Sequence, residues 1–115
     1  MADPLTEAEN LCQQTLQALE TQTRGASETI EPLRKSLQSL LSVIAESKRK
    51  VMVRSAQGQK LAQEIRDNAS KLYDVTKLPR PEGKGVDELG SRLASVEGSV
   101  TKLKIYWQSF EYATT

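Results

Sequence analysis

Few side chains in this sequence have the chemistry that catalysis needs. The 115 residues include no histidine, so no Ser–His pair, Cys–His pair or histidine-containing zinc site exists. The single cysteine, Cys12, falls on an apolar helical stripe, where it is expected to be a small buried side chain. We therefore predict that the protein is not an enzyme and holds no cofactor and no metal.

Two pairs of carboxylates and one glycine-rich basic segment also have simpler interpretations than a catalytic site. Glu7 and Glu9, like Asp87 and Glu88, fall in the first turns of predicted helices. There they complement the positive end of the helix dipole. The segment 83–85 (GKG) lacks both the Walker spacing and a preceding strand, so we interpret it as a loop.

The densest basic cluster consists of Lys48, Arg49, Lys50 and Arg54. A solvated helix face is the simplest interpretation of such a run. The functional alternative is contact with phosphates, with an acidic protein surface or with anionic lipid. No aromatic residues alternate with these basic ones, so stacking on nucleic-acid bases is not supported, and we do not expect nucleic acid as a partner.

Four of the five aromatic residues lie close together near the C-terminus: Tyr106, Trp107, Phe110 and Tyr112. Trp107 and Phe110 continue an apolar stripe, which favours a plug at the end of the core. Tyr106 and Tyr112 lie off that stripe. Because buried Trp and Tyr often dominate the energy of an interface, this group is also the best candidate for a partner hot spot, although the core plug is the favoured interpretation.

The elements that position these residues follow from the apolar spacing. Residues 29–76 keep one heptad register, which predicts a helix about 70 Å long if it is unbroken. Thr29 is its expected N-cap, and Pro32 is then harmless in the first turn. The stripe weakens over 47–58, and Gly58 costs about 1 kcal/mol against alanine, so a bend or fraying is expected there.

Shorter helices are predicted on either side of the central one. Residues 1–28 form a first helix and a breaker, with a capping box at Thr6 and a break at Gly25. The alternative is one kinked helix that continues through Gly25 and Pro32 into the central stretch. The weak apolar stripe of the first helix includes Cys12, Leu16 and Leu19. Residues 77–86 form a loop with two prolines and two glycines, which no helix survives.

The last predicted helix covers residues 87–115. Asp87 is the expected N-cap, and the regular apolar stripe continues to Phe110. Small residues on the flanks of the stripe permit close approach of a neighbouring helix but lower the intrinsic helicity. This helix should therefore depend on a partner helix.

We expect the predicted helices to bury apolar seams against one another, with part of the seam covered by another chain. Leu37, Leu72 and Leu93 depart from the pattern that favours a parallel coiled coil of two helices, so the oligomeric state stays open. The loop would also let the last helix fold back antiparallel on residues 61–75. The predicted seam residues are Ile30, Leu33, Leu37, Leu40, Ile44, Leu61, Ile65, Leu72, Val86, Leu89, Leu93, Val96, Val100 and Leu103.

Composition and charge agree with an extended helical protein. Aromatic residues make up 4% of the chain and charged residues 27%, which suits exposed helix surface better than a large globular core. The net charge is −4 over 1–29, +5 over 30–78 and 0 over 79–115. This asymmetry suits antiparallel packing of the acidic first segment on the basic second one, or recruitment of an acidic partner. With no signal-peptide pattern and no apolar run of ~20 residues, we expect an intracellular, cytoplasmic protein.

The predicted fold is all-α, an extended coiled coil or helical hairpin with about three helices. The predicted function is a non-enzymatic coiled-coil subunit that oligomerises, or joins other helical chains in a larger intracellular complex as a scaffold. The alternative is a peripheral protein whose amphipathic helices bind a membrane surface. A third possibility is a compact, self-contained three-helix bundle that acts as a monomeric adaptor.

Overall fold

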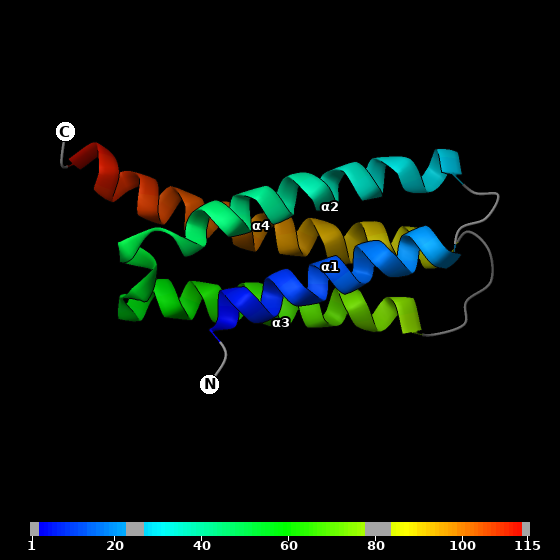
Figure 1. Cartoon of the computed structure of the whole chain (residues 1–115), viewed down its shortest axis with the longest axis horizontal. Coiled ribbons are helices and arrows are strands. Elements are labelled where there is room, and N and C mark those ends of the chain that lie inside the picture. Colours follow the sequence, from blue (N-terminus) through cyan, green and yellow to red (C-terminus); the bar gives the residue numbers. More distant parts are fainter. Residues whose placement is uncertain (1–2, 23–26, 78–83, 114–115) are drawn as a thin grey trace.

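Four α-helices and one short 3-10 helix make up the fold (Figure 1). The computed structural model describes residues 3–22, 27–77 and 84–113, with side chains described for 3–20, 31–77 and 88–110. The described residues contain no strand, which confirms the all-α class. In chain order the elements are α1 (Pro4–Gln22), α2 (Ser27–Lys48), η1 (Val51–Arg54), α3 (Ala56–Lys77) and α4 (Lys84–Ala113).

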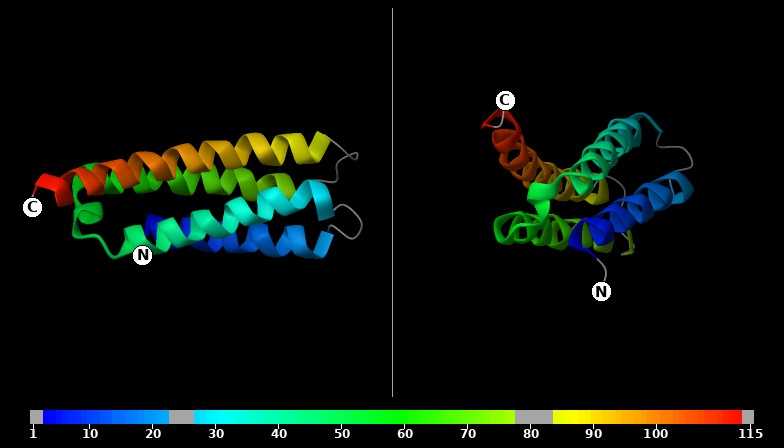
Figure 2. Two further views of the ribbon diagram at one scale, coloured as in Figure 1. Left: turned by 90° about the horizontal axis from the view of Figure 1, so that it is seen from above. Right: turned by 60° about the vertical axis from the view of Figure 1, so that its left-hand side comes forward.

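Two antiparallel hairpins lie side by side in this bundle. α1 and α2 form the first hairpin, α3 and α4 form the second, and η1 joins them at one end (Figures 1 and 2). The order around the bundle is α1–α2–α4–α3, so the consecutive helices α2 and α3 lie diagonally across it. The most extensive contacts are those of α3 with α1 and with α4. The principal extents are 49 × 28 × 18 Å.

The structure corrects the prediction of one continuous helix over 29–76. That stretch contains α2, η1 and α3, so the described residues form four α-helices rather than about three, and these make a closed bundle rather than an extended coiled coil. The break begins at Lys50, whose backbone is extended at φ −85° and ψ 127°. It lies inside the region where the apolar stripe weakens. The reversal lets both halves of the stripe face one core.

Ser55 begins the second half of this stretch by capping α3. Its hydroxyl accepts a hydrogen bond from the backbone N–H of Gly58 at 3.1 Å, as a helix N-cap does. The same hydroxyl donates to the carbonyl oxygen of Met52 at 2.7 Å. Val53 is buried at this end. The bend expected over 47–58 is therefore a full chain reversal, and the cap and the buried valine order it.

The other predicted boundaries are close to the observed ones. α2 begins at Ser27, two residues before the predicted cap Thr29, so Pro32 lies inside the helix rather than in its first turn. α4 begins at Lys84, so Asp87 is not its N-cap and lies in its first turn. Residues 23–26 and most of the predicted loop, 78–83, are outside the described residues.

The core consists mainly of aliphatic side chains from all four α-helices. Contributions from α1 differ from those predicted: Leu5, Ala8 and Thr15 are buried with Cys12 and Leu19, whereas Leu16 is half-buried. Thr15 can be buried because its hydroxyl donates to the carbonyl oxygen of Leu11 at 2.8 Å.

Small residues explain why α1 and α3 lie so close together. Ala8 of α1 and Ala62 and Ala69 of α3 have no solvent exposure. Alanine at a contact lets two helix backbones approach, and it adds little to an apolar heptad pattern. As a result α3 buries two faces, one against α1 and one against α4, while the predicted seam residue Leu61 is half-buried.

Candidate interaction surface

Most of the predicted seam lies inside this bundle. The side chains of Ile30 and Val86 are outside the described residues, and Leu33 and Leu61 are half-buried and packed against the core. The seam residues whose side chains the structure describes are thus covered by helices of the same chain. Those that are buried are Leu37, Leu40, Ile44, Ile65, Leu72, Leu89, Leu93, Val96, Val100 and Leu103.

The basic cluster and the aromatic group, predicted as separate sites, meet at one end of the bundle. The Nζ atom of Lys50 lies 4.5 Å from the centroid of the Trp107 ring, in a cation–π arrangement. α4 packs against η1, and its C-terminal turns project past η1 (Figures 1 and 2). We call the surface formed by residues 48–54 and 104–110 the η1 end.

Hydrogen bonds hold the two halves of the η1 end together. The indole N–H of Trp107 donates to the hydroxyl of Ser47 at 2.9 Å, and both side chains are buried. The hydroxyls of Tyr106 and Ser55 share a hydrogen bond of 2.7 Å. Phe110 packs on Tyr106 with the ring planes at 75°. The two hydrogen bonds fix α4 to the residues on either side of η1, at the point where the bundle ends.

The predicted hot-spot residues have different surroundings. Trp107 is 2% exposed, so its ring belongs to the core and to the contact with Lys50. Tyr106 is half-buried, and Phe110 remains 38% exposed. The side chain of Tyr112 is outside the described residues. A partner at this end can therefore reach the edge of Tyr106 and the ring of Phe110.

All the large apolar side chains that are exposed among the described residues belong to the η1 end. They are Val51 at 78%, Ile105 at 61% and Phe110 at 38% exposure. Exposed single apolar residues are common on protein surfaces, but these three share one end of an otherwise well-covered bundle. Val51 fits the heptad register predicted for residues 29–76 and is therefore expected on the apolar stripe, but α2 ends before it and leaves it exposed.

The basic cluster divides into paired and unpaired residues. Lys48 forms an ion pair with Glu9 of α1 at 3.1 Å. Arg49 and Arg54 are exposed, and neither forms an ion pair with the described residues. Residues 47–63 and 98–110 contain no aspartate or glutamate. The η1 end therefore carries an excess of positive charge beside its exposed apolar residues.

The paired carboxylates Glu7 and Glu9 connect helices. Glu7 forms an ion pair with Arg66 of α3, while Glu9 binds Lys48 of α2. Across the 3–22, 27–77 and 84–113 ranges there is no group of three or more residues suited to hold a metal. Burial raises the pKa of the Cys12 thiol to about 12, and the negative charge of Glu9 adds to the increase. A thiol with that pKa is protonated at neutral pH and is a poor nucleophile.

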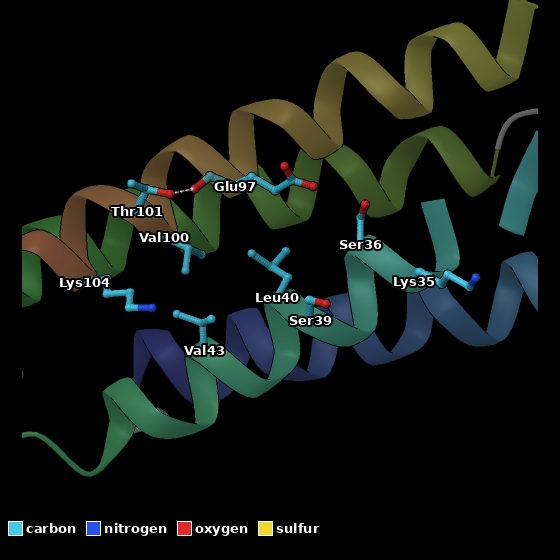
Figure 3. A pocket seen from close by; sticks show the side chains of 9 residues that line it. All are labelled: Lys35, Ser36, Ser39, Leu40, Val43, Glu97, Val100, Thr101 and Lys104. Atoms are coloured by element: carbon cyan, nitrogen blue, oxygen red, sulfur yellow. Dashed lines mark hydrogen bonds between the residues drawn. The ribbon is translucent and has the colours of Figure 1, made fainter. Parts of the chain in front are cut away.

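A groove lies between the parallel helices α2 and α4 (Figure 3). Leu40, Val43 and Val100 point into it, and its volume is about 410 Å³. Lys35 lies at one end of it, and Lys104 at the end nearest η1. Small-molecule sites enclose most of the ligand surface. Here four of the nine lining residues are themselves exposed, so the groove does not enclose a ligand.

Comparison with known proteins identifies no relative of this chain. No family model, no curated protein and no solved structure matches it. None of the described helices is both long enough and apolar enough to cross a membrane.

Proposed function

We propose that this chain is a non-enzymatic helical interaction subunit that joins a larger intracellular assembly through the η1 end. The observation that carries the proposal is the position of the exposed apolar residues. Val51, Ile105 and Phe110 lie where the basic cluster and the aromatic group meet, while the seams pack inside the bundle. Exposed apolar residues among charged ones are typical of protein interfaces.

Site-specific photo-crosslinking in cells tests this proposal. A photoreactive phenylalanine analogue would replace Val51 or Ile105 at the η1 end. As controls it would replace Gln13 of α1 or Gln38 of α2, which are also exposed. We expect the η1 end positions to give a discrete adduct with one protein. That protein, once identified and purified, should form a complex with this chain. Equal adducts from the control positions, or none from Val51 and Ile105, would contradict the proposal.

Sedimentation equilibrium of the purified chain separates the two forms of assembly. A mass of 12.8 kDa that is independent of concentration supports a monomeric bundle that binds a different protein. A multiple of that mass supports self-association, and the crosslinked partner would then be a second copy of this chain.

Binding to an anionic membrane surface is the second candidate function. Val51 is exposed in the short η1 segment, next to Lys50 and close to Arg49 and Arg54. An exposed apolar residue flanked by cations is a known means of attachment to anionic lipid. Co-sedimentation with phosphatidylserine vesicles, lost in Val51→Ser, supports this candidate, and its absence rejects it.

A further inference from the structure

We propose that the η1 end binds an acidic segment of a protein partner. The partner's carboxylates pair with Arg49 and Arg54, and its apolar side chains cover Val51 and Phe110. This inference rests on the function proposed above and specifies the chemistry of the partner. It follows from the charge, the exposed apolar residues and the shape of this end of the bundle.

The charge of the η1 end selects an acidic partner. Its two segments lie in stretches without acidic residues, 47–63 and 98–110, and these contain seven lysines and arginines. The nearest acids in the sequence are Glu46, Glu64, Glu97 and Glu111, and Glu64 is paired with Lys102. Arg49 and Arg54 are exposed and form no ion pair with the described residues. Guanidinium groups in this state favour carboxylates, which they bind with two hydrogen bonds.

The apolar part of the surface is rigid before any partner arrives. The Trp107–Ser47 and Tyr106–Ser55 hydrogen bonds fix α4 to the segments on either side of η1. Gln59 adds a further bond, since its side-chain amide donates to the carbonyl oxygen of Val53 at 2.9 Å. A surface that is already ordered loses little entropy when it binds.

The arrangement of the apolar residues favours a protein over a lipid surface. Ile105 and Phe110 are five residues apart on α4, which separates them by about 140° around the helix and about 7.5 Å along it. A flat membrane cannot contact both faces of the helix together. The C-terminal turns of α4 project past η1 (Figures 1 and 2), so a folded or folding protein segment can contact both faces.

Unbiased peptide-display selection against the intact chain tests this inference. We expect the enriched peptides to be acidic and to carry leucine or aromatic anchors. The double variant Arg49→Glu/Arg54→Glu should bind such a peptide at least about tenfold more weakly. The matched control is Lys71→Glu/Arg92→Glu, which changes the net charge equally at exposed positions away from the η1 end and should bind normally.

Further variants separate the two kinds of contact at the η1 end. Val51→Ser should also weaken binding. Ser39→Trp, which fills the groove between α2 and α4, should not weaken it. Exchanging the acidic residues of the peptide for lysine should restore its binding to the Arg49→Glu/Arg54→Glu variant. Circular dichroism melting verifies that each variant keeps its fold.

The outcomes distinguish this inference from the function on which it rests. Enriched peptides that are not acidic but still depend on Val51 would overturn the acidic partner and leave the interaction role standing. Binding that is lost in Ser39→Trp alone would place the site in the groove and overturn the inference. If no peptide is enriched while phosphatidylserine vesicles bind through Val51, both the inference and the protein-interaction role are wrong.

Discussion

Two helical glycines, Gly58 in the first turn of α3 and Gly98 within α4, should respond in opposite ways to the same substitution. Propensity alone predicts that alanine stabilises the protein at either position by ~1 kcal/mol. At Gly98 of α4 a new Cβ atom would meet no heavy atom within 4 Å. We therefore expect Gly98→Ala to raise the free energy of unfolding by about 0.5–1 kcal/mol.

At Gly58 the new methyl group would collide with the backbone of η1. An added Cβ atom would lie 2.5 Å from the carbonyl oxygen of Val53 and 2.6 Å from that of Met52. These atoms belong to the backbone, so η1 itself must move away from α3. Overpacking of this kind costs ~1–3 kcal/mol, which outweighs the gain in helix propensity. The movement would also stretch the hydrogen bond from the Gly58 N–H to Ser55.

Thermal and urea unfolding followed by circular dichroism measures both effects. Gly98→Ala should raise Tm by about 3–6 °C, and Gly58→Ala should lower it by at least as much. Gly90→Ala is a second control, because its Cβ atom would lie 4.0 Å from the side chain of Leu33, an ordinary contact. If Gly58→Ala stabilises the protein as much as the two controls do, the close approach of η1 to α3 does not exist in solution.

Three further predictions concern buried polar groups. Burial raises the pKa of Cys12 from 9.0 to about 12, so the folded state retains a proton that the unfolded state loses as the pH rises above 9.0. Relative to Cys12→Ala, the wild type should lose about 1.4 kcal/mol of stability per pH unit above 9.0 in urea titrations, and equal slopes would show that the thiol is accessible to water. Ser55→Ala should cost ~1–2 kcal/mol in urea unfolding, since it removes the N-cap of α3, whereas Tyr106→Phe should cost less; similar losses would contradict the capping role. Ser47→Ala should cost about 1–3 kcal/mol because it leaves the buried N–H of Trp107 without an acceptor, and an unchanged urea midpoint would argue against that bond.

The sequence predicted the helical class and the faces of α2 and α4 because both depend on local spacing. Leu37, Leu40 and Ile44 recur at three- and four-residue intervals, and Leu93 to Leu103 do the same on α4. Such a stripe must be buried wherever its partner helix comes from. The pattern does not specify that partner. From the sequence we therefore expect another chain to cover part of these residues, whereas in the structure the helices of the same chain cover them.

The break between α2 and α3 was harder to predict because the heptad register continues across it. Ile44, Val51 and Gly58 are seven residues apart, although the residues between Lys48 and Ala56 form no α-helix. Apolar spacing does not reveal whether the intervening backbone is helical. The available signals were the loss of apolar residues after Ile44 and a serine three positions before Gly58, which is the spacing of an N-cap and its N3 residue.

The contact between α1 and α3 escaped prediction for a different reason. Ala8 of α1 and Ala62 and Ala69 of α3 are fully buried, and alanine contributes weakly to an apolar pattern. Alanine matters here because its small side chain leaves room for a neighbouring helix, and only the packed structure shows where a helix uses that room. The meeting of Lys50 with Trp107 likewise depends on the chain reversal at η1, and no local pattern in either segment encodes it.

Polar pairs explain how one register of α4 is selected from several. The apolar stripe of α4 is regular, so a shift by one heptad would bury nearly the same apolar surface. In the observed register Asn68 donates to the hydroxyl of Ser99 at 2.5 Å, and Trp107 reaches Ser47. A shifted helix would lose the Asn68–Ser99 bond and leave the buried N–H of Trp107 without its acceptor Ser47, and the second loss costs about 1–3 kcal/mol. Since the same register places Trp107 under Lys50 and Tyr106 against Ser55, the folding of the bundle and the assembly of the η1 end are one event.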